Sequence, residues 1–314
     1  LFSRIHYVRV PPGTPKGKSR VLNYGLSITD GDYVVVYDAD NRPEPSAVRL
    51  LVEAAEGEPG AAGAVGYVKT INARTNLLTR MIALEFQVFQ LLMQSGRWQL
   101  LKLGSLPGTN MLLKRDVLEQ LGWYDPWALA EDAELTMRIS TAGYTLPVVA
   151  EAVTWEQEPE NIKTFIKQRT RWLMGNLYLL EKSFLNRSYW KKKALLHSVH
   201  HVLTYFLFAF LLLFSHVTAM MGLAGLVDLQ FSVPILMLWQ MSYVVYTFQL
   251  IGALVLNRQA SLINCGIALI MYFTYAQTFI IILLRSLVLY VWKRHIQGQN
   301  IEWDKTIRFK GRAI

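Results

Sequence analysis

Three long apolar stretches limit the possible folds of this chain, at about residues 195–220, 233–256 and 262–284. Each is long enough to cross a bilayer as a helix, whose backbone polar groups satisfy one another in lipid. Residues 190–314 carry 11 Lys or Arg against 3 Asp or Glu, whereas residues 1–189 carry 21 against 20. The composition therefore predicts a polar domain, transmembrane helices within 191–292 and a basic tail over 293–314.

The positive charges flank the apolar stretches instead of clustering with stacking aromatic residues, which is typical of membrane orientation and argues against nucleic-acid binding. Lys191 to Lys193 place the start of the first stretch in the cytosol, and the loop 222–232, without Lys or Arg, is expected outside. Arg258 then lies inside. A third full crossing would put the basic tail outside, so either this stretch crosses incompletely, with a bend near Arg285, or the charge rule fails. The chain is predicted to be a multi-pass plasma-membrane protein with a cytosolic polar domain.

The first half alternates strand-like and helix-like stretches, which predicts an α/β domain with a mainly parallel sheet. The expected strands are 6–10, 33–37 and 64–69, and the expected helices are 17–28, 45–56 and 133–141. Residues 75–103 are apolar but carry Glu85, Gln87, Gln90 and Gln94, so they predict a packed or interfacial helix instead of a span. Because residue 1 is leucine and the chain opens on a strand-like stretch, we expect it to be the C-terminal part of a longer protein.

Two acidic residues, Asp38 and Asp40, follow the apolar strand 33–37 directly, where open α/β sheets place their ligands. In an extended backbone, residues two apart point the same way. Both carboxylates can therefore approach one hard cation, such as Mg²⁺ or Mn²⁺, that bridges a diphosphate. Acids after a strand also form ordinary turns, and Asn41 and Pro43 would complete one here. On these residues alone both interpretations stand.

Three further polar segments have both a functional and a structural interpretation. Lys18 opens the helix 17–28, whose N-terminal N–H groups could bind an anion with the lysine, although a solvated loop is the alternative. Glu131 and Asp132 begin another helix, where a charged carboxylate is stabilised and could act as a base or only as a capping acid. The third segment is a compact turn that could line a site or merely reverse the chain, made of Gly108, Thr109 and Asn110.

A basic and aromatic segment runs from Gln168 to Trp172, shortly before the first apolar stretch. Gln168 and Trp172 are four residues apart on a helix and share a face, with Arg171 beside them. A guanidinium can bind phosphate bidentately, and an indole offers a flat apolar platform for a sugar ring. The alternative is a basic amphipathic helix on anionic lipid, and one helix can serve both purposes. Residues 161–190 are therefore interpreted as an interfacial amphipathic helix region.

The order of these motifs is more specific than any one of them. The ordered set resembles the signature of membrane-bound processive family 2 glycosyltransferases, which include cellulose, hyaluronan and poly-N-acetylglucosamine synthases. It comprises Gly17-Lys18-Ser19, Asp38-Ala39-Asp40, Gly108-Thr109-Asn110, Glu131-Asp132 and Gln168-Arg169-Thr170-Arg171-Trp172. The resemblance is strong over residues 1–190. It implies a GT-A-type nucleotide-sugar-binding domain over 1–160 whose N-terminus is incomplete, because the family's first strand and the acidic residue after it have no counterpart.

The resemblance also implies roles for individual residues. The donor and its Mg²⁺ or Mn²⁺ would be held by Lys18, Asp38, Asp40 and Arg171, with the two aspartates as metal ligands. The acceptor would be bound by Gly108, Thr109, Asn110, Glu131, Gln168 and Trp172. Asp132 matches the general base of the family's Thr-Glu-Asp motif, in which Ala130 replaces the threonine here.

The function implied by the resemblance is inverting transfer of a sugar from a UDP-sugar to a growing β-linked polysaccharide at the cytosolic membrane face. Membrane lipid and accessory export subunits would be its other partners. A nonprocessive membrane transferase with a lipid acceptor is the alternative, and Arg171-Trp172 favours the polymerase. A membrane transporter or receptor with a cytosolic domain is a third alternative, which two or three spans make a poor fit.

Overall fold

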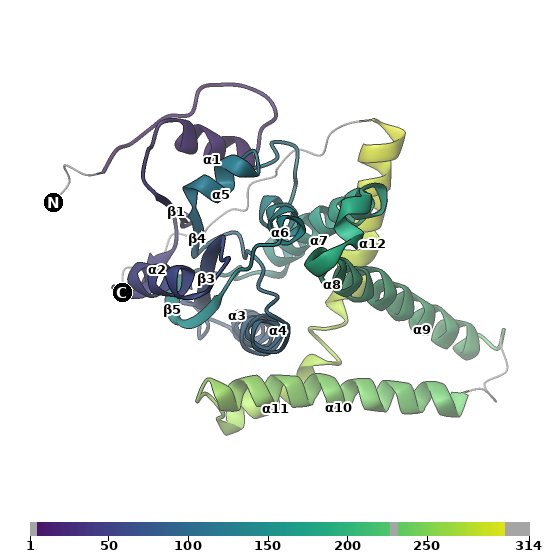
Figure 1. Cartoon of the computed structure of the whole chain (residues 1–314). Coiled ribbons are helices and arrows are strands. Elements are labelled where there is room, and N and C mark those ends of the chain that lie inside the picture. The colour runs from purple at the N-terminus through teal and green to yellow at the C-terminus, as the bar shows by residue number, and fades with distance from the viewer. Residues whose placement is uncertain (1–4, 227–231, 299–314) are drawn as a thin grey trace.

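The computed structural model describes residues 5–226 and 232–298, in which an α/β domain adjoins a group of long helices (Figure 1). The domain contains a five-stranded sheet of order β1-β4-β3-β5-β2. The strands are β1 (Tyr33–Val36), β2 (Arg42–Pro43), β3 (Gly63–Thr70), β4 (Met111–Lys114) and β5 (Val148–Glu156). The predicted strands 33–37 and 64–69 are thereby confirmed.

The sheet is mixed, so the prediction of a mainly parallel sheet is wrong. Among the described strands only β3 and β5 pair in parallel, whereas β4 runs antiparallel to β1 and β3, and β2 runs antiparallel to β5. β4 runs backwards because the long helical segment after β3 returns the chain to the edge at which β1 ends, where Val36 pairs with Met111. This register brings the residues after β1 and those before β4 together at one edge.

The predicted strand 6–10 is also wrong, because these residues form an irregular segment. Tyr7 is 92% exposed and Val8 is 44% exposed, so no sheet covers the side chains that suggested a strand. A strand outside a sheet has no neighbouring strand to bond its backbone N–H and C=O groups. Water can bond these groups equally well in an irregular segment, so nothing favours the extended form here.

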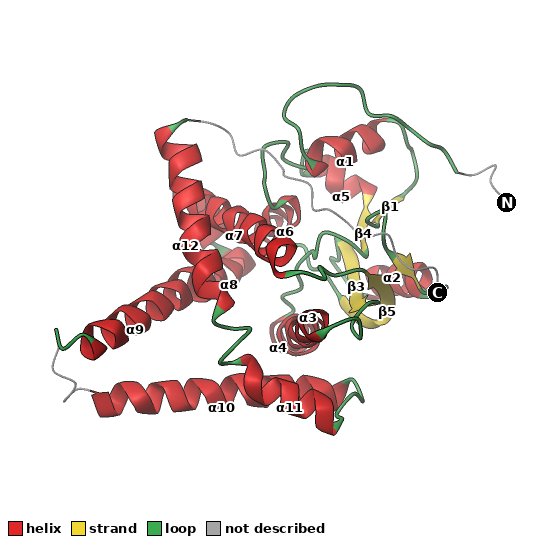
Figure 2. Ribbon diagram, turned by 180° about the vertical axis from the view of Figure 1, so that it is seen from behind, coloured by secondary structure: helices red, strands yellow, loops and turns green. Residues whose placement is uncertain are grey.

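Helices cover both faces of the sheet (Figure 2). On one face α2 (Ala47–Gly57) buries Leu51 and Ala55 against β3 and β4. The other face packs against α1 (Lys18–Ser27), α5 (Arg115–Gln120) and α6 (Glu131–Ala142), and shares the largest core cluster with them. This two-sided cover is the layer arrangement of α/β domains, and it confirms the helices predicted at 17–28, 45–56 and 133–141.

The predicted packed helix 75–103 is confirmed as a continuous helical segment that lies against the sheet. It consists of α3 (Leu77–Gln87), a π-helical segment η1 (Val88–Gln94) and α4 (Ser95–Leu101). Asn76 caps it, accepting from the Thr79 N–H. The buried Gln90 side chain donates to Val68 O at 2.7 Å and accepts from Val68 N at 2.6 Å, so one of the polar residues that argued against a span binds the edge of β3.

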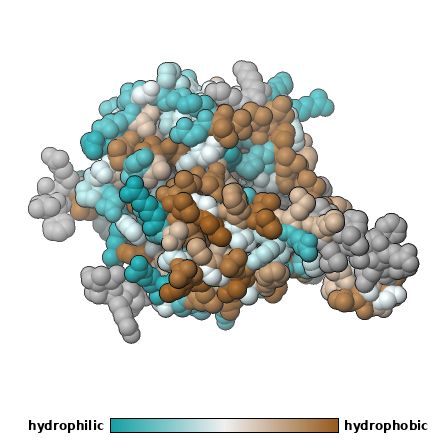
Figure 3. All heavy atoms as spheres, turned by 90° about the horizontal axis from the view of Figure 1, so that it is seen from below, coloured by the Kyte–Doolittle hydropathy of each residue, from teal (hydrophilic) through white to brown (hydrophobic). Residues whose placement is uncertain are grey.

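The described residues from 162 onward are mainly helical, and the later helices among them are strongly apolar. Its helices are α7 (Ile162–Leu185), η2 (Arg187–Trp190), α8 (Lys192–His201), η3 (Val202–Leu207), α9 (Phe208–Leu223), α10 (Ser232–Leu256), α11 (Leu262–Met271), α12 (Thr278–Val291) and η5 (Trp292–Ile296). In the described residues two helices, Ala194–Leu223 and Trp239–Leu256, are long and apolar enough to cross a membrane by length and composition. Apolar side chains gather on the face seen from below in Figure 3, and exposed residues such as Val244, Phe248 and Leu262 belong to the lowest helices.

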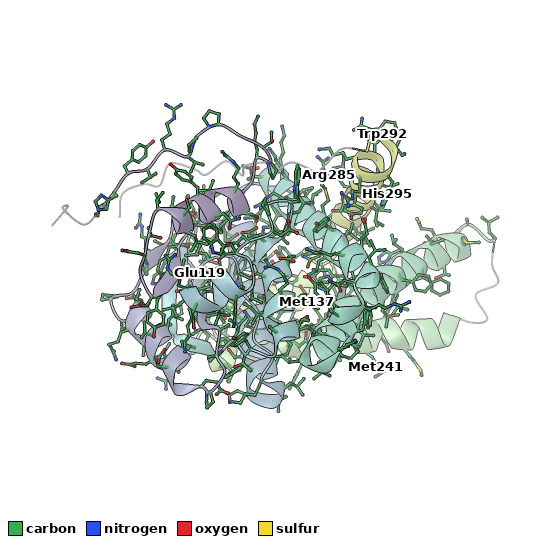
Figure 4. The ribbon with its side chains drawn as sticks, turned by 45° about the horizontal axis from the view of Figure 1, so that its top comes forward. Glu119, Met137, Met241, Arg285, Trp292 and His295 are labelled. Carbon is green, nitrogen blue, oxygen red and sulfur yellow. The ribbon has the colours of Figure 1, made fainter. Side chains whose placement is uncertain are left out.

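The third apolar stretch is broken by a turn at residues 272–277, between α11 and α12. The Gln277 amide ends the turn by donating to Tyr272 O at 2.7 Å, which satisfies a carbonyl that a continuous helix would bond. One of the two alternatives for this stretch included a bend near Arg285. The break lies earlier, at 272–277, and Arg285 lies within α12 (Figure 4). The basic tail from residue 299 onward and residues 227–231 of the loop 222–232 lie outside the described residues.

Candidate active site

Lys18, the first residue of α1, joins three separate segments at the sheet edge. Its ammonium donates to Asp38 Oδ1 at 2.7 Å and to Gly108 O at 2.6 Å, and lies 3.8 Å from Glu131 Oε1. Burial opposes protonation, but the charges of Glu131 and Asp38 outweigh it and raise the pKa of Lys18. The lysine is therefore cationic at the point where the ends of β1, the turn before β4 and the start of α6 converge.

Two turns are tied together beside this lysine. The Asp38 N–H donates to Asn41 Oδ1 at 2.7 Å and to Thr109 Oγ1 at 3.1 Å, and the Thr109 hydroxyl also donates to the Asn41 side chain. Gly108 has a φ of +86°, and a side chain there would place its first carbon 2.9 Å from Asp132 Oδ2. Both the backbone conformation and the close approach of Asp132 therefore favour glycine at this position.

Asn110 occupies a different environment from the rest of its turn. Its side chain is fully buried and donates to Tyr67 O at 3.1 Å and Ala152 O at 2.7 Å, bridging β3 and β5 at an irregularity in their register. The amide thus holds the sheet and, through the backbone, the position of the turn. Contact between Asn110 and the acceptor stays a prediction. Both hydrogen bonds of its side-chain NH₂ group go to the backbone of the sheet.

The two carboxylates that begin α6 are both shifted toward the protonated form. Burial, and then the neighbouring Asp132, raise the pKa of Glu131 to about 7 from its ordinary 4.5. Burial also raises the pKa of Asp132, against the opposing effects of the Ala133 N–H, which donates to its Oδ1 at 2.8 Å, and of Lys18. A carboxylate whose pKa is brought toward neutrality is suited to accept a proton during a reaction.

Helix α7 carries the basic and aromatic segment past this cluster. Gln168 is 2% exposed, and its Oε1 has no hydrogen-bond partner among the residues that the structure describes. The charge of Arg171 lowers the pKa of Asp132, so the guanidinium acts on the proposed base. Trp172 is 36% exposed and contacts Arg169 and Phe86. The structure thus brings Arg171 to the Lys18 cluster and leaves the indole partly open to solvent.

The close approach of α7 to the start of α6 depends on two small residues. A side chain at Gly175 would place its first carbon 2.8 Å from the Ala130 Cβ, so the helix passes directly over the residue before Glu131. Met137, near the centre of the molecule in Figure 4, packs with Leu179 and Tyr189 further along. Alanine in place of the family's threonine at position 130 therefore lies in a tight helix contact.

The residues at the end of β1 fit a divalent cation in part. Asp38 and Asp40 supply carboxylate oxygens, the donors that Mg²⁺ and Mn²⁺ prefer, and both are partly exposed. Across residues 5–226 and 232–298, no group of three or more His, Cys, Asp or Glu side chains is arranged to hold a metal ion. A cation at these aspartates would therefore take further oxygens from a bound ligand, as Mg²⁺ commonly does with phosphates.

The structure adds residues that the sequence interpretation did not place in the site. Asn41 was expected only to complete a turn, yet its side chain joins the Asp38 and Thr109 turns. Arg169 was part of the motif without a role, and it forms an ion pair with Glu85 of α3. Glu85 is the only acidic residue in the apolar stretch 75–103, and this is the sequence signal that could have suggested a buried cationic partner.

Comparison with solved structures identifies the class of fold. The chain resembles the mannosyltransferase PcManGT from Pyrobaculum calidifontis, solved in complex with GDP-Man and Mn²⁺, with a TM-score of 0.50 and 17% identity. The match covers 90% of this chain and 68% of that protein. The α/β domain with its mixed sheet is therefore a GT-A-like glycosyltransferase fold, which the sequence resemblance predicted.

Sequence comparison identifies the family. Residues 33–293 match the family described as Glycosyl transferase family group 2. A Bacillus subtilis (strain 168) protein named "Probable glycosyltransferase YdaM" is 38% identical over 303 residues, which cover 95% of this chain and 71% of that protein. Poly-beta-1,6-N-acetyl-D-glucosamine synthase of Staphylococcus aureus (strain COL) is 24% identical over 54% of this chain and 41% of its own length. The chain belongs to glycosyl transferase family group 2, and it is a glycosyltransferase.

Proposed function

We propose that this protein transfers a sugar, with inversion, from a UDP-sugar to a growing β-linked polysaccharide at the cytosolic face of the plasma membrane. The observation that carries the proposal is the convergence of Lys18, Asp38 and Asp132 on the turn at Gly108. A cation for a diphosphate and a buried carboxylate with a raised pKa lie at one edge of the sheet, an arrangement that suits displacement at an anomeric carbon.

The chemistry follows from these positions. Asp132 takes the proton of an acceptor hydroxyl, whose oxygen attacks the anomeric carbon while the bond to the diphosphate oxygen breaks. Lys18 and Arg171 stabilise the negative charge that develops on the leaving diphosphate. A divalent cation held by Asp38 and Asp40 would supply further neutralisation of that charge. One displacement inverts the anomeric centre, so an α-linked donor yields a β-linked product.

The membrane and polymer parts of the proposal rest on separate support. The two apolar helices Ala194–Leu223 and Trp239–Leu256 suit a multi-pass protein, and the related S. aureus protein is named as the synthase of a β-linked polymer. The partly exposed Trp172 beside these helices suits an acceptor end that is held between additions. Acceptor contacts by Gly108, Thr109, Glu131 and Gln168 belong to the same proposal.

The decisive experiment is product analysis. Membranes containing the protein are incubated with each of several UDP-sugars, and the products are sized and digested with hydrolases specific for β-linkages. We expect a polymer sensitive to a β-specific enzyme, whose formation stops when a chelator removes divalent metal. A single sugar on an extracted lipid would favour the lipid-acceptor alternative. Full activity in excess chelator would contradict the metal roles of Asp38 and Asp40.

A further inference from the structure

Arg169 has no part in the chemistry above, yet it is buried on the helix that carries Arg171 and Trp172. Its side chain is 3% exposed, and Nη2 lies 2.5 Å from Glu85 Oε2 on α3. The guanidinium carbon is 4.1 Å from the centre of the Trp172 ring, and it also lies 5.3 Å from that of Phe165 and 5.4 Å from that of Phe86. Three aromatic rings therefore surround the cation, which pairs with Glu85 and is also influenced by the charge of Glu158.

The same carboxylate reaches a third part of the chain. The Tyr275 hydroxyl, in the turn between α11 and α12, donates to Glu85 Oε2 at 2.5 Å. The Tyr275 ring also packs against Phe165, with ring centres 5.3 Å apart. Glu85 thus links α3, α7 and the turn that divides the third apolar stretch.

A buried ion pair of this kind contributes more to geometry than to stability. Burial opposes the charge of Arg169, but Glu85 outweighs it and raises the pKa of Arg169, so the guanidinium stays charged. Replacing such pairs by apolar residues is often neutral for stability, because desolvation offsets their attraction. A desolvated guanidinium over an indole face, by contrast, attracts the ring and helps to hold it in place.

The Trp172 ring is held on one side and open on another. One face lies against Arg169, and Phe86 meets it edge-on, with ring centres 6.3 Å apart and planes at 62°. The residue nevertheless remains 36% exposed. Because the Trp172 side chain is already held in one rotamer, it loses less conformational entropy when a ligand binds than a free side chain would.

We propose that Arg169 and Glu85 are positioning residues, which hold the Trp172 indole as a preformed platform for the acceptor sugar ring. The inference rests on the proposed function for the identity of the ligand. The Arg169 guanidinium faces the ring that the acceptor would use on its other side, and Glu85 keeps the guanidinium oriented. Arg171, two residues further along, acts electrostatically on Asp132.

The kinetic test uses Arg169→Met, which keeps the length of the side chain and removes its charge. We expect the KM for an oligosaccharide acceptor to rise about tenfold, with the donor Kd and the rate of donor hydrolysis by water unchanged. The acceptor KM of Arg169→Lys should lie between those of the wild type and Arg169→Met, because lysine keeps the charge but lacks the planar guanidinium. The control is Lys182→Met on the same helix, which breaks the ion pairs with Asp125 and Glu134. It should lower the Tm and leave the acceptor KM within about twofold.

A second readout does not depend on catalysis. In protein labelled with 5-fluorotryptophan, the fluorine resonance of position 172 is assigned by its loss in Trp172→Phe. We expect Arg169→Met and Glu85→Gln to shift or broaden this resonance, and Lys182→Met to leave it unchanged. If Arg169→Met does not fold, Glu85→Gln and Phe86→Leu answer the same question.

The outcomes separate the two proposals. An unchanged Trp172 resonance in the Arg169 and Glu85 variants would overturn the positioning role, and so would a changed resonance with a wild-type acceptor KM. If the wild-type protein transfers no sugar at all, the proposed function fails, while the fluorine spectra still test whether Arg169 holds the indole.

Discussion

Two groups of charged side chains meet α6, and their charges are balanced in opposite ways. At the start of the helix, Lys18 is surrounded by the carboxylates of Asp38, Glu131 and Asp132. Arg171 adds a second cation that acts on Asp132. Negative charge exceeds positive charge in this group, and burial raises the pKa of both carboxyl groups on the helix.

One turn further along, the second group is closed. Glu134 is fully buried and accepts from Lys182 at 2.7 Å and from Arg138 at 2.9 Å. Lys182 also donates to Asp125 at 2.8 Å. Burial would raise the pKa of Asp125, but hydrogen bonds from Lys182 and the Trp127 N–H outweigh it and lower that pKa. Two carboxylates and two cations satisfy one another here.

Charge balance therefore separates a site from a structural network on the same helix. A closed network has no charge left for a ligand, and removing one member costs stability. An unbalanced group stores electrostatic energy that a cation, a diphosphate or a proton can relieve. Variants of the Lys18 group should therefore change activity more than stability, and variants of the Glu134 group should do the opposite.

The largest effect is expected from Asp132→Asn, which removes the proposed base and keeps its shape. Turnover should fall about 10³-fold, because a general base contributes about 10²–10⁴. Donor affinity, measured by calorimetry, should stay close to wild type. Asp116→Asn, an exposed acid at the start of α5, is the control and should retain full activity. Wild-type turnover in Asp132→Asn would make the base assignment wrong.

Glu134→Gln tests the closed group. It leaves Lys182 and Arg138 facing a neutral amide, and breaking a buried pair in this way costs about 3 kcal/mol of stability. Thermal unfolding should show a clear drop in Tm, with kcat per folded molecule retained. Glu53→Gln, which breaks the exposed pair with Arg49, should cost less than about 0.5 kcal/mol. A loss of kcat without a loss of Tm would erase the distinction between the groups.

Lys18→Met should weaken the donor side of the open group. One charge-assisted contact to a diphosphate contributes about 2 kcal/mol, or about 30-fold in kcat/KM. The expected change lies in donor affinity and turnover together, and the Tm should move little. The exposed neighbour Lys16→Met serves as the matched control. Equal losses in both variants would point to general surface charge instead of a specific contact.

Much of the open group could be predicted from the sequence, because its members follow recognisable element ends. Asp38 follows a continuous apolar strand, and Asp132 begins a helix after a turn-rich segment. Their order along the chain carried the resemblance to the family. Lys18 was expected one element upstream, and its contacts with Asp38 and Glu131 agree with that placement.

The features that could not be predicted depend on contacts between distant segments. The antiparallel strand β4 is four residues long and has too little pattern to identify, so the sheet was expected to be mainly parallel. Asn110 was assigned to the acceptor with its turn, whereas its amide bridges Tyr67 and Ala152. Hydropathy identified the third apolar stretch but not its break at 272–277. At this break the Gln277 side chain forms hydrogen bonds with Tyr272 O and with the His216 ring.

The smallest expected effect is on the pH dependence of stability, which differs in sign between the two groups. A carboxyl group whose folded pKa is raised stabilises the fold below its unfolded pKa, and this stability is lost as the pH rises through the folded pKa. Glu131 should thus make the protein less stable between pH 4.5 and about 7. Asp125, whose pKa is lowered, contributes stability that is lost only as the pH falls through that lowered value.

Glu131→Gln removes the titrating group and the negative charge beside Asp132. The Tm should then vary less with pH across this window, and the lower pKa of Asp132 should move the acidic limb of kcat/KM to lower pH. Tm and kcat/KM measured from pH 4 to 9 check both. Asp125→Asn, in the closed group, should leave the acidic limb in place. If the acidic limb of kcat/KM does not move in Glu131→Gln, the carboxyl groups of Glu131 and Asp132 titrate independently. The electrostatic reason for treating them as one site would then be lost.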